Sequence, residues 1–192
     1  MTAQPQDVRQ QILHEATRLF VDRGYHGLSM REIAEAVGVS KAGLYYHFKD
    51  KEDLFLAILT NNLERLEQTI QQARQAAAVR GQVELFVTEI FQWAPEQRAI
   101  IRLASQEMDH LSQHSVTEFT RLYHAKFISQ IQAMLAAGIE HGELRAMDPV
   151  VATWLLLGMM YPYLYSSHAG EMNTSTEAVQ LMLSIFFDGA AT

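Results

Sequence analysis

Apolar residues recur every three or four positions along most of the chain, which is the spacing of an amphipathic helix. No segment alternates apolar and polar residues as a strand would. The pattern predicts helices over about 7–23, 30–37, 41–47, 50–79, 82–93, 95–110, 115–140, 149–166 and 175–188. The short connections contain Gly, Pro, Ser or Asp, as expected of turns. We therefore predict an all-α chain of about nine helices.

The segment from residue 29 to 54 contains two short helical patterns separated by a three-residue turn. Ser29 and Glu32 form a capping-box pattern at the start of the first helix. Gly38 can end that helix because it tolerates a positive φ, and Ser40 can cap the second helix. Two helices joined by a Gly-containing turn of this length match a helix-turn-helix unit, whose second helix enters the DNA major groove.

Composition is compatible with this interpretation. The chain has 192 residues and a net charge of −7. It contains no cysteine, which excludes disulfides and thiolate zinc sites. Most of the acidic excess lies after residue 60, whereas Lys41, Lys49 and Lys51 form a basic patch beside the second helix. The N-terminal segment lacks the apolar run of a signal peptide, so we expect a cytoplasmic location.

Residues 8 to 59 resemble the N-terminal domain of the TetR family of transcriptional regulators. The residues that carry the resemblance are Ile12, Ala16, Phe20, Gly24, Tyr25, Ser29, Ile33, Ala34, Ala36, Gly38, Val39, Ser40, Gly43, Leu44, Tyr45, His47, Phe48, Lys51 and Leu54. The resemblance implies an N-terminal three-helix DNA-binding domain, placed at residues 1–50. Residues 51–192 would form a helical domain for effector binding and dimerisation.

The resemblance also implies which residues contact a double-stranded DNA operator: Ser29, Arg31, Lys41, Gly43, Tyr45, Tyr46, His47 and Lys51. In the second helix, Leu44 and Phe48 lie four residues apart and are expected to face inward. Lys41 and Arg31 suit base edges, whereas Tyr45, His47 and Lys51 suit phosphates. Gly43 would permit close approach. Alternatively, one of the two tyrosines packs against the first helix, and His47 caps or packs.

Motifs for other chemistry are absent. Gly38 and Gly43 are spaced as in a P-loop, but Leu44 follows where lysine is required. No nucleophile elbow occurs, and we predict neither an enzyme nor a cofactor. Glu107, His110 and His114 would share one helical face and could hold zinc if the helix continued through residue 113. A polar helix end with two exposed histidines is the favoured interpretation, because Ser112 and Ser115 suggest that the helix stops.

The two C-terminal helical patterns are apolar on nearly all sides. The first, residues 149–165, is shorter than the roughly 20 residues of a membrane span and contains Pro162. Such helices must be buried against more than their own domain. The resemblance implies that the last two helices form a four-helix dimer interface. We place Leu183 and Phe186 in that interface, and homodimerisation suits an operator of two half-sites.

An effector cavity is implied by the resemblance, and its location is predicted from aromatic and flexible apolar residues of the C-terminal part. The candidates are Phe91, Trp93, Leu103, Met108, Phe119, Tyr123, Phe127, Trp154, Met159 and Tyr163. They indicate a small, mostly apolar organic effector. The sequence thus predicts a dimeric repressor released from its operator by ligand. The alternative is a helical ligand-sensing or partner-binding module that does not bind DNA.

Overall fold

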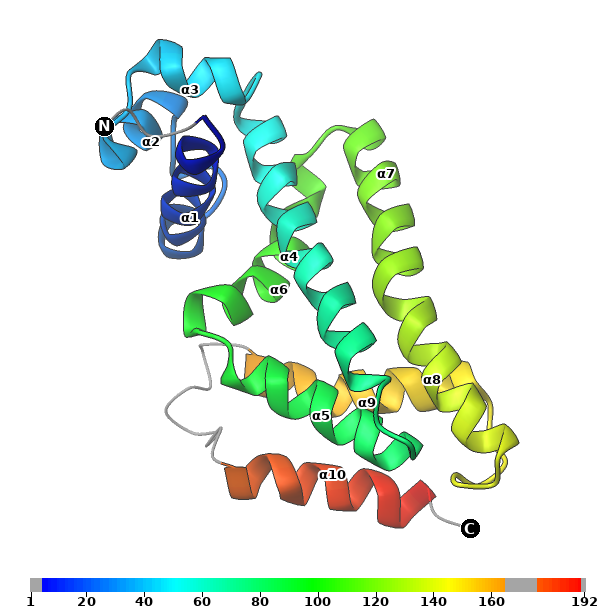
Figure 1. Ribbon diagram of the computed structural model, residues 1–192. Helices are drawn as coiled ribbons and strands as arrows, with labels where there is room; N and C mark the ends of the chain where they lie inside the picture. The colour runs from blue at the N-terminus through cyan, green and yellow to red at the C-terminus, as the bar shows by residue number, and fades with distance from the viewer. Residues whose placement is uncertain (1–4, 165–175, 191–192) are drawn as a thin grey trace. The chain divides into compact units, whose positions relative to one another are not determined.

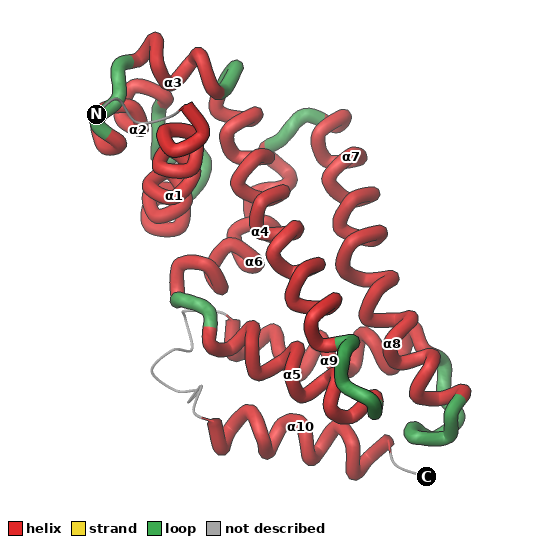
Figure 2. Tube along the Cα trace, viewed as in Figure 1, coloured by secondary structure: helices red, strands yellow, loops and turns green. Residues whose placement is uncertain are grey.

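The computed structural model describes residues 5–164 and 176–190, and these residues form helices and short connections without a strand (Figures 1 and 2). The helices are α1 (Pro5–Arg23), α2 (Met30–Val37), α3 (Lys41–His47), α4 (Lys51–Ala73), α5 (Val79–Gln92), α6 (Pro95–Glu107), the 3₁₀ turn η1 (Met108–His110), α7 (Gln113–Tyr123), the π-helical η2 (His124–Ile128), α8 (Ser129–Glu140), α9 (Pro149–Leu164) and α10 (Thr176–Ala190).

The predicted all-α fold is confirmed. Helices α7, η2 and α8 follow one another without a break in Figure 1, and counting them as one gives nine helices in the described ranges. The prediction of one helix over 115–140 gave its end correctly, but the helix begins at Gln113 and contains a π-helical turn. The expected end of the penultimate helix at residue 166 lies outside the described residues.

Two compact units divide the chain. The first comprises residues 1–62 and 95–119, and its core forms where α1 packs against both α2 and α6. Ile12, Ala16 and Phe20 lie on one face of α1 and are fully buried. Helix α6, distant in sequence, joins the N-terminal helices in this unit through its contacts with α1. The domain boundary that we expected at residue 50 stays a prediction.

The second unit comprises residues 63–94 and 120–192. In it α8 packs against α9 and α5, and α10 packs against α5 and α9. Gly138 marks a close approach of α8 to the start of α5, since a Cβ there would lie 2.6 Å from a methyl carbon of Val79. Next to this approach, Glu143 Oε2 accepts a hydrogen bond of 2.7 Å from the Val79 N–H. That carboxylate supplies an acceptor to one of the first N–H groups of α5.

Helix α4 ends earlier than the sequence predicted. We expected it to continue to about residue 79, but it ends at Ala73, and α5 begins at Val79 and contains Gly81. Arg74 Nη2 donates to the carbonyl of Gln130 at 2.9 Å, which holds the connection after α4. Such a contact across 56 residues leaves no local signal, so the prediction was wrong for a tertiary reason.

No described helix combines the length and the apolar character needed to cross a membrane. Helix α9 is the most apolar of them, and it has 16 residues with Pro162 inside.

Gly138→Ala should destabilise the protein by about 1–3 kcal/mol, because the added methyl group overlaps Val79 at the α5–α8 contact. Urea unfolding followed by circular dichroism measures the change. Gly81→Ala is the matched control, since its Cβ would meet Ala76 at an ordinary 3.4 Å. There the better helix propensity of alanine should leave stability unchanged or raised. Equal losses in both variants would contradict the packing argument.

Candidate nucleic-acid interface and effector site

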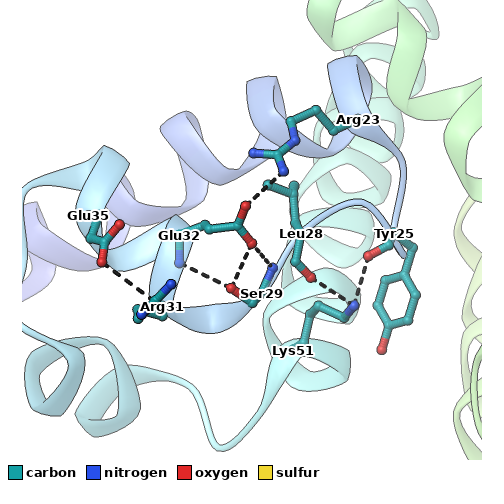
Figure 3. A network of polar contacts seen from close by, with 8 residues as sticks. All are labelled: Arg23, Tyr25, Leu28, Ser29, Arg31, Glu32, Glu35 and Lys51. Carbon is teal, nitrogen blue, oxygen red and sulfur yellow. Dashed lines mark hydrogen bonds and ion pairs between the residues drawn. The ribbon is translucent and has the colours of Figure 1, made fainter.

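The start of α2 is fixed by a complete capping box (Figure 3). Ser29 Oγ accepts from the N–H of Glu32 at 3.3 Å, and Glu32 Oε2 accepts from the N–H of Ser29 at 2.9 Å. Arg23 Nη2 donates to the other carboxylate oxygen at 2.8 Å. Hydrogen bonds from the Ser29 hydroxyl and from Arg23 lower the pKa of Glu32 to about 2. This network confirms the capping-box prediction and ties α2 to the end of α1.

The predicted turn between α2 and α3 is also confirmed. Gly38 has a φ of 77°, and its N–H donates back to the α2 carbonyls of Ala34 and Glu35. A side chain at this φ would be strained, so glycine is needed where the chain reverses. Ser40 then caps α3, its Oγ accepting from the N–H of Gly43 at 3.0 Å.

Helix α3 presents a short exposed surface above two buried anchors. Leu44 and Phe48 are buried as predicted. Tyr45 is 44% exposed and Tyr46 is 81% exposed, so neither packs into the core and the packing alternative for them is not supported. Lys41 is exposed as well, with its Nζ 5.8 Å from the centre of the Tyr45 ring.

Lys51 lies differently from the other predicted DNA contacts. Its Nζ donates to the carbonyl of Tyr25 at 2.8 Å and to that of Leu28 at 3.0 Å, and it lies 4.2 Å from the centre of the Tyr25 ring (Figure 3). An ammonium group has three N–H donors, and two are used here. Lys51 therefore holds the α1–α2 connection in place, a role that sequence analysis missed.

The remaining predicted contacts surround α3. Arg31 extends from α2 with most of its side chain exposed and lies 3.7 Å from Glu35. Ser29 uses its hydroxyl in the capping box. A Cβ at Gly43 would lie 3.2 Å from Ser40 Oγ, so the missing side chain also leaves room for the cap. His47 is half-buried, with its ring 5.1 Å from that of Tyr46.

The corner between α6 and α7 contacts the start of α4 within the first unit. Glu52 accepts hydrogen bonds from the N–H and hydroxyl of Ser112 and from the hydroxyl of Ser115. These hydrogen bonds, that of the Ser112 hydroxyl foremost, lower the pKa of Glu52 below its usual range. One carboxylate thus connects the first turn of α4 to the cap of α7.

The sequence alternative of a metal site at Glu107, His110 and His114 is not supported. The helix does not continue past the 3₁₀ turn, so the three side chains do not share a helical face. His110 Nε2 lies 3.7 Å from Glu107, and its ring instead meets His26 edge-on at 4.2 Å. Within residues 5–164 and 176–190, no group of three or more His, Cys, Asp or Glu side chains is arranged to hold a metal ion.

The predicted effector residues divide between the two units. Leu103, Met108 and Phe119 belong to the first unit, and the others belong to the second. Phe91, Trp93 and Phe127 are buried, and Met159 and Tyr163 are half-buried. Trp154 is 46% exposed, which removes it from an interior site. It failed as a prediction because α9 has apolar residues on all its sides, so periodicity does not show which residues face inward.

Aromatic residues gather beside the π-helical turn in the second unit. The Tyr123 hydroxyl lies 3.2 Å from that of Tyr161, and its ring is 5.3 Å from that of Phe127. Phe127 also meets Phe86 at 6.2 Å. Burial raises the pKa of Tyr123 well above its usual value, so its phenol stays protonated. Sequence analysis missed Tyr161 because it lies in a continuous apolar run, and missed Phe86 because its helical spacing fits an ordinary core residue equally well.

Both C-terminal helices carry exposed apolar side chains. They are Val150, Val151, Trp154 and Leu155 on α9, and Leu181 and Ile185 on α10. We call this set the α9–α10 apolar surface. Leu183 and Phe186, which we expected in the dimer interface, are buried within the protomer instead. The expectation was wrong because they occupy the face of α10 that turns into its own unit.

The helical fold and the glycine-ended helix pair define a helix-turn-helix regulator. A family model described as bacterial regulatory proteins, tetR family, matches residues 12–58. A model for a Tetracyclin repressor-like C-terminal domain matches residues 76–163. The chain belongs to the TetR family of bacterial transcriptional regulators, as the resemblance implied.

Known proteins of similar sequence and fold agree with this assignment. The HTH-type transcriptional repressor AcnR of Corynebacterium efficiens is 38% identical over 80 residues, which cover 42% of this chain and 43% of that protein. The match thus spans less than half of that relative. PfmR from Thermus thermophilus superposes with a TM-score of 0.79 at 25% identity, covering 92% of this chain and 97% of that one. AibR, solved with isovaleryl coenzyme A and operator DNA, has the same fold at 24% identity, with a TM-score of 0.78 and coverage of 94% and 98%.

Glu32→Gln should lower stability at pH 7, because an amide replaces the charged acceptor at the start of α2. The pKa of Glu32 is lowered from 4.5 to about 2 on folding, so its stabilisation is complete above pH 4.5 and is lost as pH falls toward 2. The melting-temperature difference from the parent should shrink across that interval. Glu35→Gln, which removes an exposed partner 3.7 Å from Arg31, should have a smaller effect at every pH.

Proposed function

We propose that this chain is a cytoplasmic DNA-binding repressor that binds a palindromic operator as a homodimer and is released by a small, mostly apolar organic effector. The geometry of α3 carries the proposal. A seven-residue helix, fixed at its start by Ser40 and at its base by two buried anchors, exposes Lys41, Tyr45 and Tyr46 together. A helix presented in this way has the length and polarity to enter a major groove.

The roles of the contacts follow from donor chemistry and exposure. Lys41 and Arg31 are exposed cations whose donors match guanine O6 and N7. Tyr45, Tyr46 and His47 carry donors suited to phosphate oxygens, and the third N–H of Lys51 suits one as well. Ser29 and Gly43 act indirectly: the Ser29 hydroxyl caps the start of α2, and Gly43 permits close approach of the backbone.

Dimerisation is supported by the α9–α10 apolar surface. Single exposed apolar side chains are common on soluble proteins, but here six large ones lie on two helices that pack together. Such a concentration of exposed apolar residues is typical of a protein–protein interface. Two copies meeting at a two-fold axis would bury the same patch on both protomers. This symmetry would match an operator of two half-sites.

Effector binding is supported by the aromatic group beside η2. Short π-helical segments occur often at functional sites, and Tyr123 is the last residue before this one. The Tyr123 and Tyr161 hydroxyls would orient a ligand among Phe91, Phe127, Met159 and Tyr163. The structure of AibR with isovaleryl coenzyme A and operator DNA supports a small organic effector for this fold.

The proposal is tested in two steps. A DNA duplex is first selected from random sequences by binding to the protein, and its affinity is then measured across a series of salt concentrations. Specific binding should weaken steeply with salt as counterions are released, and the selected site should be palindromic. No measurable binding to any duplex would favour a ligand-sensing module that does not bind DNA, and equal affinity for all duplexes would contradict a specific operator.

Lys41→Ala should weaken binding to the selected duplex by about 1–3 kcal/mol and broaden the base preference, with little change in melting temperature. Lys51→Ala should lower the melting temperature, because the Tyr25 and Leu28 carbonyls lose their shared donor. If Lys51 also contacts phosphate, the slope of log affinity against log salt falls by about one unit. Fluorescence anisotropy and thermal melts of both variants separate these roles.

Leu181→Glu and Ile185→Glu should convert the dimer into a folded monomer, because each places two charges in one symmetric interface. Sedimentation velocity measures the change, and far-ultraviolet circular dichroism checks the fold. Leu183→Glu is the contrast: its side chain is buried in the protomer, so it should lower stability rather than only split the dimer. Dimers that persist in both exposed-site variants would place the interface elsewhere.

A further inference from the structure

Arg65 on α4 and Trp93, the residue that follows α5, meet within the second unit. The guanidinium carbon of Arg65 lies 4.5 Å from the centre of the Trp93 ring. Trp93 is 3% exposed, and its backbone N–H donates to the carbonyl of Ile90. The indole is therefore held in place with a cation over its face.

Both side chains bring donors to this position, and the described residues supply no acceptor for the indole. Trp93 Nε1 is buried and has no hydrogen-bond partner in the described part of the chain. A buried N–H without an acceptor is costly, and native structures rarely keep one without a reason.

Arg65 is likewise without a carboxylate partner among the described residues. Its helical neighbours three and four positions away are Asn61, Asn62, Gln68 and Thr69, all neutral. The nearby acid Glu67 is bound to Lys126 at 2.6 Å. Glu64, the residue before Arg65, is exposed and forms no ion pair with Arg65 in the described part of the chain. The half-buried guanidinium thus lies over an indole whose N–H has no acceptor, and no carboxylate of the described residues is paired with it.

From this pair we infer that the effector carries a carboxylate, which Arg65 and Trp93 bind. The inference rests on the proposed effector function and adds its ligand class. One carboxylate oxygen would accept from Trp93 Nε1 and the other from the guanidinium, which satisfies both donors. A neutral carbonyl would satisfy the indole alone, and a cationic ligand would be repelled.

The same segment supplies an apolar surface for the rest of the ligand. Phe91, two residues before Trp93, is buried and meets Tyr163 edge-on at 5.8 Å. An apolar body with one terminal carboxylate fits this combination of aromatic rings and donors better than a sugar or a base.

Calorimetric titration of the full chain with matched pairs tests the inference: straight-chain carboxylates of four to about sixteen carbons, each beside its neutral amide. At least one carboxylate should bind about tenfold or more tightly than its amide, the scale of a charge-assisted pair. Arg65→Gln should remove most of this preference while leaving amide affinity nearly unchanged. A loss of structure alone would weaken both ligands of a pair.

Two further variants make the test specific. Trp93→Phe keeps a ring beneath Arg65 but removes the N–H, so it should weaken the carboxylate several-fold more than the amide. Arg80→Gln is the matched control, because Arg80 is a cation of the same unit that lies over Phe187 and pairs with Glu84. It should leave the preference intact.

Failure of the inference differs from failure of the proposed function. If no carboxylate binds more tightly than its amide, including the case in which nothing binds, or if Arg80→Gln lowers the preference as much as Arg65→Gln, the inference is overturned. Specific DNA binding by the empty protein would stand in either case. A carboxylate that binds as expected but leaves operator affinity unchanged would instead contradict the release mechanism.

Discussion

A recognition helix of seven residues is too short to be stable by itself, so every property of α3 depends on what fixes it in the fold. Helices of fewer than about twelve residues are marginal in water even for favourable sequences. The seven residues of α3 include Gly43, which lowers helix propensity further. The buried side chains of Leu44 and Phe48 must therefore hold the helix in place. The exposed face of α3 can then be polar without lowering the stability of the helix.

The anchors are effective because their surroundings are themselves fixed at the ends of helices. Glu32 joins the start of α2 to the end of α1 through Arg23, and Lys51 binds two carbonyls of the intervening connection. These bonds join α1, the α1–α2 connection, α2 and the first turn of α4.

Local signals explain which parts were predictable from sequence. The α2–turn–α3 unit was predicted to the residue, because capping serines, a left-handed glycine and helical periodicity all act within a few positions. The end of α4, the partners of Lys51 and the inclusion of α6 in the first unit depend on contacts between distant residues. The inward face of α9 left no signal, because its residues are apolar on all sides. In α10 the buried residues Val179, Met182, Leu183, Phe186 and Phe187 do follow helical spacing, but the sequence does not show whether that face packs within the protomer or against a second copy.

In the second unit, a buried donor without an acceptor indicates the ligand's chemical class better than the aromatic residues around it do. Aromatic content predicted a site but did not distinguish Phe91 from the exposed Trp154. What separates Trp93 from its aromatic neighbours is an indole N–H without an acceptor and a guanidinium over the ring that has no carboxylate partner in the described residues. Trp93 also stands two residues before Pro95, where α6 begins, and α6 packs against α1. Under the proposed effector function, the indole donor that would bind the carboxylate therefore lies two residues from the first residue of α6 along the chain.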